Sequence, residues 1–125
     1  MIKRVASGVV LNPRQCAKFL KVVADETRLR IVGSLLTEEK CVTDLVHELD
    51  CPQPHVSHHL RILRDSGVVE GRRAGKQVCY RIAPIVGRAL ATRRGKALDF
   101  GCCELRFPDS VRATIKGRKL NMASL

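Results

Sequence analysis

The sequence predicts a mainly α-helical domain with one small β-hairpin, and three observations lead to this fold class. Apolar residues recur at helical spacing in several stretches before residue 67. Two short stretches with strand character, 68–72 and 77–82, flank a glycine-containing turn. The composition is 45% hydrophobic but only 3% aromatic, so the core must be aliphatic, as in packed helices. A chain of 125 residues fits one domain, expected over 1–108, with a basic C-terminal tail over 109–125.

The first two helices are marked by residues that cap helix N-termini. Asn12 followed by Pro13 is a cap and first-turn pair, and the apolar spacing after it predicts a helix over residues 13–24. Asp25 can cap a second helix, which ends at the polar residues 37–40. We expect these two helices to pack through their apolar stripes.

A pair of shorter helices follows, separated by a tight turn. Apolar spacing predicts a helix over residues 42–49. The segment 50–54 cannot continue it, because two prolines each remove a backbone donor and restrict the preceding residue. A fourth helix then runs to about Ser66, with Gly67 as its C-terminal stop.

The second half of the chain is expected to begin with a hairpin. The strands over 68–72 and 77–82 enclose the basic turn 73–76. A last helix is expected over residues 84–98, although its two glycines weaken it.

Two short helices joined by a turn and followed by a basic hairpin define a winged helix-turn-helix, whose second helix fits the major groove of DNA. Polar side chains on the outer face of that helix can reach base edges, whereas basic side chains near its end and on the hairpin suit phosphates. The expected base-reading residues are Gln53, Ser57, His58 and Arg61, with His55 beside them, and the expected phosphate-binding residues are Arg64, Arg72, Arg73 and Lys76.

The charge balance favours a polyanionic partner. The formal net charge is +11, and basic residues outnumber acidic ones 15 to 5 from Arg61 onward, against 8 to 7 before it. No stretch approaches the roughly 20 apolar residues of a membrane span, and the apolar residues 5–11 are too few for a secretory signal. We therefore expect a cytoplasmic protein without a membrane partner.

Three groups of residues carry a resemblance to a known family: ADETRLRI over 24–31, QPHVSHHLRILR over 53–64, and the GVV at 67–69 together with the GK at 75–76. Over about residues 14–86 the chain resembles the ArsR/SmtB repressors. The resemblance implies a symmetric homodimer, built on the first and last helices, that represses transcription from an inverted-repeat operator until a ligand releases it. One departure is Pro52, which stands where the family usually has a hydroxyl residue before the recognition helix.

Six cysteines in a reducing compartment are expected to be thiols, and no C-x-x-C pair is present to indicate a zinc ribbon or finger. Cys102 and Cys103 are adjacent, so the backbone can turn two soft sulfurs toward one thiophilic ion. We therefore expect trivalent arsenic, inorganic or methylated, or antimony as the inducer, with no permanent cofactor.

Cys41 is the candidate third ligand. It begins the third helix beside Lys40, and both a helix N-terminus and a cation stabilise a thiolate. It also resembles the first cysteine of the family's C-V-C-D-L metal box, although Thr43 replaces the second cysteine of that box. The complete helix-three site of that box is therefore absent.

The remaining cysteines have simpler interpretations. Cys16 and Cys51 are expected to be small core residues. Cys79 lies on the opposite face of its strand from Val78 and Tyr80, and nothing near it in the sequence completes a site.

Three other functions compete with the inducer-released repressor. The same repressor could instead sense oxidants or persulfides through Cys41 and the adjacent pair. Zinc at His55 and His59 has correct helical spacing but lacks the acidic and histidine partners of the family's zinc sensors. A small thiol enzyme would need a partnered nucleophile or a cofactor loop, and the sequence has neither, so we expect no enzyme.

Overall fold

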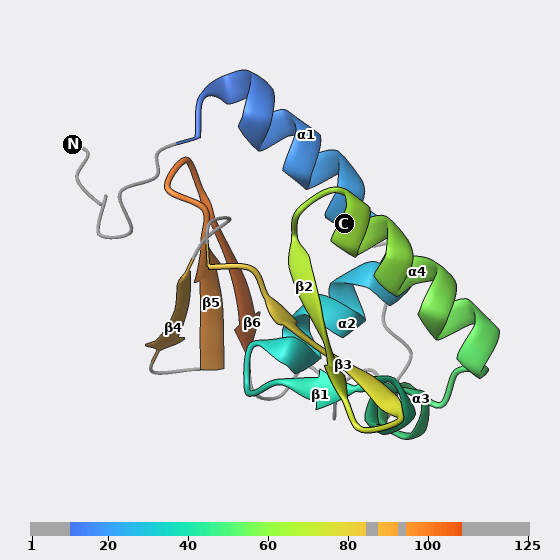
Figure 1. Cartoon of the computed structure of the whole chain (residues 1–125). Coiled ribbons are helices and arrows are strands. Elements are labelled where there is room, and N and C mark those ends of the chain that lie inside the picture. The colour runs from blue at the N-terminus through green and yellow to red at the C-terminus, as the bar shows by residue number, and fades with distance from the viewer. Residues whose placement is uncertain (1–10, 85–87, 93–94, 109–125) are drawn as a thin grey trace, which may run out of the picture.

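The computed structural model describes residues 11–84, 88–92 and 95–108, which form a helical body with two small antiparallel sheets (Figure 1). Within these ranges the elements follow in the order α1 (Pro13–Val23), α2 (Glu26–Leu35), β1 (Lys40–Cys41), α3 (Val42–Leu49), α4 (Gln53–Asp65), β2 (Val69–Ala74), β3 (Gln77–Ile82), β4 (Arg88–Thr92), β5 (Gly95–Asp99) and β6 (Glu104–Pro108).

The caps of α1 and α2 are those that the sequence predicts. The Asn12 side chain accepts a hydrogen bond from the Gln15 backbone N–H at 2.9 Å, and the Gln15 side chain accepts one from the Asn12 N–H at 3.0 Å. The Asp25 carboxylate accepts from the Arg28 N–H at 3.1 Å, which starts α2. These caps satisfy backbone donors that have no partner inside the helix.

The turn between α3 and α4 confirms the expected helix-turn-helix. Asp50 ends α3 in the left-handed conformation with φ of 54°, which an aspartate tolerates better than most residues. Pro52 is the N-cap of α4 and makes no side-chain hydrogen bond, so the hydroxyl cap usual in the family is absent. Gly67, with φ of 82°, lets the chain leave α4 toward the hairpin.

The core lies between α2, α3 and α4, and it is aliphatic as the composition predicts. Most of its fully buried side chains come from one stripe on each helix and from the start of β2, because those stripes face one another, and Leu98 and Phe100 add to them from β5 and the turn after it. They include Ile31, Val32, Leu45, Val56, Leu60, Leu63, Val68 and Val69. This packing fixes the outward face of α4.

The predicted hairpin is present and gains a third strand. β2 and β3 pair in antiparallel register from Val69 with Ile82 to Ala74 with Gln77, and the sheet order is β1-β3-β2. The short β1 pairs Lys40 with Tyr80 and Cys41 with Cys79. The wing, defined here as residues 69–82, is therefore attached to the segment that leads into α3.

The predicted last helix over 84–98 is wrong, because the described parts of this segment are strands. β4 and β5 pair from Arg88 with Asp99 to Thr92 with Gly95, and β5 pairs with β6. Apolar residues follow a two-residue period around the β5–β6 turn: Leu98 and Phe100 are buried and Leu105 and Phe107 pack on the core. That period suits strands, and the two glycines disfavour a helix.

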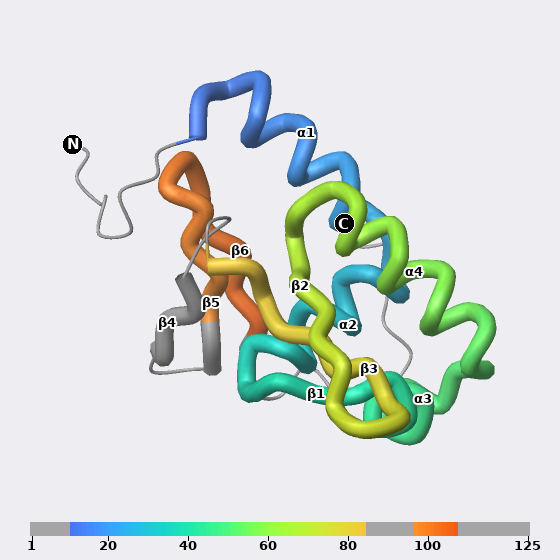
Figure 2. Tube along the Cα trace, in the orientation of Figure 1, coloured from blue at the N-terminus to red at the C-terminus, as the bar shows by residue number. Residues whose placement is uncertain are grey.

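The C-terminal sheet packs against the first two helices. The Phe100 ring stacks on the Phe19 ring of α1 with centroids 6.3 Å apart, and Phe107 covers Gly33 of α2, where an added Cβ would come within 2.9 Å of its ring. Figure 2 traces the turn between β5 and β6 beside α1. The expected tail, 109–125, lies outside the described residues, and within those that are described none of the helices is long and apolar enough to span a bilayer.

Candidate DNA-binding surface and cysteine cluster

The α4 helix presents the predicted reading residues on its outer faces. Its apolar stripe of Val56, Leu60 and Leu63 is fully buried, which leaves the other faces for solvent. The structure places the predicted α4 residues on those faces: Gln53, His55, His58, Arg61 and Arg64 are exposed and Ser57 is half-buried. A helix held by its apolar stripe with polar side chains outward can enter a major groove.

The wing adds exposed cations beside that helix. Arg72 and Arg73 on β2 and Lys76 in the turn are exposed, and β2 contacts α4. Arg72 is paired with Glu39 at 2.6 Å, so its guanidinium must exchange this partner to bind a phosphate. Arg64 similarly lies 3.2 Å from Asp65. Such exposed pairs are weak and open readily, so they leave both arginines able to bind phosphate.

The inner edge of α4 carries a histidine whose proton affinity is altered by its surroundings. His59 is half-buried, and its Nδ1 lies 3.9 Å from the Asp25 carboxylate, beyond hydrogen-bond distance. Burial lowers the pKa of His59 below the ordinary 6.5, and the nearby Asp25 charge offsets this only in part. The neutral ring is therefore favoured near neutral pH.

We expect the stability of the folded protein to fall in mild acid because of His59. The unfolded chain, in which His59 has its ordinary pKa of 6.5, binds the proton more readily than the folded protein does. The contribution of His59 to the free energy of unfolding is therefore complete above pH 6.5 and is lost as the pH falls through the lower pKa of the folded state. His59→Gln should therefore flatten the loss of unfolding free energy between about pH 7 and pH 5. Urea unfolding followed by circular dichroism measures this, with the exposed His55→Gln as control. An unchanged slope in His59→Gln would contradict the assignment.

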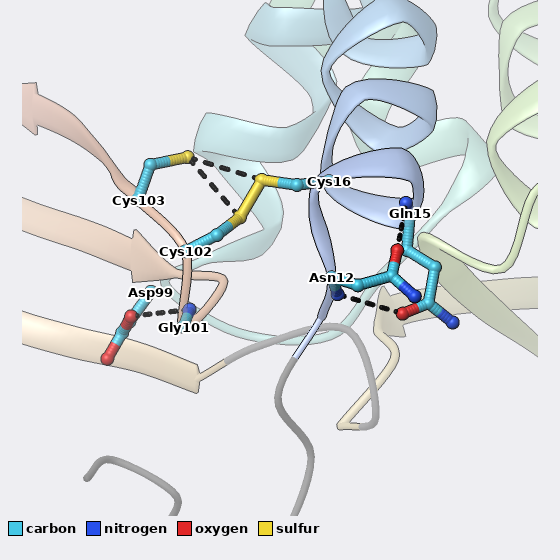
Figure 3. The surroundings of a disulfide bond; sticks show 7 residues. All are labelled: Asn12, Gln15, Cys16, Asp99, Gly101, Cys102 and Cys103. Atoms are coloured by element: carbon cyan, nitrogen blue, oxygen red, sulfur yellow. Dashed lines mark hydrogen bonds between the residues drawn. A yellow bond between two sulfur atoms is a disulfide. The ribbon is translucent and has the colours of Figure 1, made fainter. Parts of the chain in front are cut away.

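Three cysteine sulfurs gather where α1 meets the turn between β5 and β6 (Figure 3). The ligand atoms of Cys16, Cys102 and Cys103 all lie within 4.8 Å of one another, and the structure bonds Cys16 to Cys102 as a disulfide. The Cys103 sulfur is 3.9 Å from that of Cys16 and 4.0 Å from that of Cys102. We call these three residues the cysteine cluster.

The cluster combines one exposed, one half-buried and one buried residue, so a small solute can reach it from one side. Burial raises the pKa of the Cys103 thiol, and the Asp99 carboxylate raises it further. Cys103 must therefore lose its proton when it binds a soft ion. Asp99 itself accepts a hydrogen bond from the Gly101 N–H at 2.8 Å, which shapes the turn that carries both adjacent cysteines.

The structure differs from two expectations about the cysteines. Cys41, the candidate third ligand, is bonded to Cys79 and lies outside the cluster. Where the sequence predicts six thiols in a reducing compartment, the structure contains two disulfides and leaves Cys51 and Cys103 outside them. The physical reason is proximity: Cys41 and Cys79 are directly opposed in the β1–β3 pairing, and this register determines their partnership.

Sequence reasoning missed Cys16 as a member of the cysteine cluster. It lies on the buried stripe of α1, where a cysteine normally acts as a small apolar residue, and it is only 7% exposed. Its partner Cys102 is 86 positions away, so no local spacing connects them. Cys79 was left without a partner for the same reason, because strand register is not visible in the sequence.

The helix-turn-helix, the exposed α4 and the basic wing define this chain as a winged helix-turn-helix protein. The pattern of the bacterial regulatory protein, arsR family, matches residues 25–71. The chain is 43% identical over 100 residues to the arsenic resistance transcriptional regulator ArsR1 of Pseudomonas putida, covering 79% of this chain and 77% of that one. This chain therefore belongs to the arsR family.

Two further comparisons bear on the site. The transcriptional repressor SmtB of Mycobacterium tuberculosis is 46% identical over 66 residues, which cover 53% of this chain and about half (49%) of that repressor. The solved homodimeric winged helix-turn-helix DNA-binding domain Mb0332 of Mycobacterium bovis has a TM-score of 0.53 and 33% identity, covering 56% of this chain and 65% of that chain. Other relatives are named for mercury and cadmium resistance, so the relatives alone do not choose among soft metals.

Proposed function

We propose that this protein is a DNA-binding transcriptional repressor that a thiophilic ion, trivalent arsenic or antimony, releases from its operator by binding to the cysteine cluster. The carrying observation is the group of three sulfurs within 4.8 Å of one another, next to a helix that contacts α4. No enzymatic step is part of this proposal. A repressor that binds operator DNA and uses reduced thiols would act in the cytoplasm, and we propose that location for this protein.

The donor set fits a trivalent metalloid. Thiolates select soft ions, and inorganic trivalent arsenic accepts three sulfurs, whereas a methylated trivalent arsenic accepts two. The Cys16–Cys102 disulfide must first be reduced by a dithiol, which supplies two electrons and two protons, leaves two thiols on the protein and becomes a cyclic disulfide itself. Arsenous acid then exchanges its three hydroxyl groups for three sulfurs and releases three waters. The proposed ligands are therefore Cys102 and Cys103, with Cys16 in the role first assigned to Cys41.

The position of the cluster supports an effect on DNA binding. Cys16 lies on α1, and the other two ligands lie in the turn after β5. An ion bound by all three ties these elements together, and α1 packs on α2 and contacts α4. If the tied arrangement differs between the DNA-binding and the free state, the ion lowers DNA affinity by stabilising the free state.

A homodimer on an inverted repeat is the proposed assembly. One helix-turn-helix reads only a half-site, and the solved relative is a homodimer, so two copies would read two half-sites about one DNA turn, roughly 10 base pairs, apart. The family resemblance implied a dimer built on the first and last helices, but residues 84–98 do not supply that last helix among the residues described. Of the two helices expected in that interface, the described residues contain the first, α1.

A two-step experiment tests the proposal. The reduced protein is used to select duplexes from a random pool. Sedimentation of the free protein and of the protein bound to the selected duplex then gives the number of protomers in each. The selected duplex is then challenged with arsenite, methylated trivalent arsenic, antimonite, zinc and a hydroperoxide. We expect two protomers per inverted repeat and release by the arsenicals or antimonite at the lowest concentrations. A monomer on an asymmetric site, or release by zinc alone, would contradict the proposal.

The disulfide between Cys16 and Cys102 favours a second candidate, the same repressor acting as a thiol redox or persulfide sensor. Cys103 lies close to both bonded sulfurs and could exchange with either of them. Mass spectrometry separates the two signals: an oxidant leaves a disulfide or a covalent adduct, whereas a metalloid is removed by a competing dithiol.

A further inference from the structure

A second sulfur pair lies inside the DNA-binding half of the molecule, where the wing joins α3. β1 and β3 pair at two positions, Lys40 with Tyr80 and Cys41 with Cys79, and β2 pairs with β3 on its other side. After Cys41 the chain turns into α3, so strand pairing with β1 stops there. Cys79 is therefore the position nearest the wing tip at which this pairing holds the wing to the body.

Beyond that position the half-buried Val78 packs against the core, and the other described contact of the tip with the body is an exposed hydrogen bond, from the Thr43 hydroxyl to the Gln77 side-chain oxygen at 2.9 Å. Level with Cys79, Arg72 pairs with Glu39 at 2.6 Å. Exposed contacts of this kind contribute little to holding a segment in place. The covalent bond at Cys79 is therefore the strongest restraint on the tip that carries the expected phosphate-binding cations.

The other end of the bond lies at the start of the helix-turn-helix. Cys41 is the N-cap residue of α3, and its backbone N–H donates to the Asp44 carboxylate at 2.9 Å. α3 buries Leu45 and Leu49 and contacts α4. Figure 1 shows β1, β3 and α3 gathered together at one end of the molecule. The Cys41–Cys79 bond thus joins the wing to α3, the helix that packs against α4.

The two sulfurs differ in accessibility, and this sets an order of reaction. Cys41 is half-buried, whereas Cys79 is only 5% exposed. A hydroperoxide therefore reacts with Cys41 first. It oxidises the Cys41 thiol to a sulfenic acid and is itself reduced to water or an alcohol. The Cys79 thiol then attacks that sulfur, which forms the disulfide and releases one water. A dithiol reductant reverses the step by two exchanges and becomes a cyclic disulfide itself.

We propose that Cys41 and Cys79 form a reversible thiol–disulfide site that fixes the wing to α3 when oxidised and frees the wing tip when reduced. The consequence for DNA rests on the proposed function: a wing already held in place loses less conformational entropy on binding, so the oxidised protein binds duplex more tightly. This site shares no residue with the cysteine cluster, so the molecule has two separate sulfur centres with opposite effects on DNA affinity.

Hydrogen exchange of the full chain tests the site without any DNA. Wild-type protein is compared after hydroperoxide and after dithiothreitol, with thiol trapping to identify the bonded pair. We expect faster exchange of wing amides at residues 70–78 on reduction, in the wild type and in Cys102→Ser, which lacks the other disulfide. Cys41→Ser should exchange rapidly under both conditions. Equal wing exchange in the two states of the wild type would overturn the proposal.

Binding to the selected duplex gives the second measurement. We expect the oxidised form to bind roughly five- to tenfold more tightly, and Cys41→Ser to lose this difference while the matched Cys51→Ser keeps it. A full difference retained in Cys41→Ser would also overturn the proposal. A wing response in a protein that binds no duplex in either state would contradict the proposed function while supporting the disulfide site.

Discussion

Replacement of Cys102 and Cys103 by serine should abolish release from the operator by any trivalent arsenical. A serine oxygen is a hard ligand and does not substitute for a thiolate toward a soft ion. The loss of affinity should exceed the roughly 10- to 100-fold that removal of an outer-sphere partner of a metal site costs. Fluorescence anisotropy of a labelled operator duplex, titrated with each arsenical, measures the release.

The third sulfur should distinguish the two arsenicals. Cys16→Ser leaves a two-sulfur site, which is complete for a methylated trivalent arsenic and one ligand short for the inorganic ion. We therefore expect Cys16→Ser to weaken the arsenite response selectively. Cys51→Ser is the matched control, since this cysteine is outside the cluster and outside a disulfide. Release that survives in the Cys102→Ser, Cys103→Ser double variant would end the cluster hypothesis, and equal responses in Cys16→Ser would remove that residue from it.

Geometry also changes the expectation for Cys41. The sequence predicts Cys41 as the third ligand, because this residue resembles one cysteine of the family's metal box. In the structure the Cys41 sulfur is bonded to Cys79 and lies outside the cluster. Cys41→Ser should therefore leave both arsenical responses intact. A selective loss of the arsenite response in Cys41→Ser would restore the original assignment.

The helical half of the fold is predictable because its signals are local. Asn12, Asp25 and Gly67 act within one turn of the chain, and the buried stripe of α4 is visible as a 3.6-residue period. The DNA-binding residues follow directly, since they are the polar positions that this stripe leaves outside. The structure adds the pairing of Arg72 with Glu39, which depends on how the wing folds over the residues before β1.

The C-terminal half is not predictable in the same way, because its signals are non-local. The segment 84–98 contains good helix formers, which compete with its two glycines and with the two-residue apolar period around the β5–β6 turn. Contacts with α1 and α2, such as the ring of Phe100 on Phe19, add to the strand signal and are not visible in the sequence. Cysteine partnership is likewise a property of the fold. Separations of 86 and 38 residues leave many possible pairings, and connectivity cannot be deduced from sequence alone.

Arg61→Ala should remove sequence discrimination while leaving general DNA binding. Arg61 is exposed near the middle of α4 and belongs to no ion pair among the residues described. An arginine there can donate two hydrogen bonds to a guanine edge, an interaction that provides about 1–3 kcal/mol of discrimination. Competition of the selected duplex against scrambled duplexes should therefore show a loss of specificity of up to about a hundredfold.

Removal of the wing cations should have the complementary effect. Arg73→Ala with Lys76→Ala should weaken binding to all duplexes alike and lower the slope of log affinity against log salt by about 0.9 for each phosphate that the protein no longer neutralises. Arg106→Ala is the control for charge alone, because Arg106 is exposed on β6, belongs to neither α4 nor the wing, and lies 3.6 Å from Glu104. If the wing variant changed base preference while Arg61→Ala left it intact, the two roles would be reversed. A salt slope that fell equally in Arg106→Ala would mean that the wing acts through net charge and binds no particular phosphate.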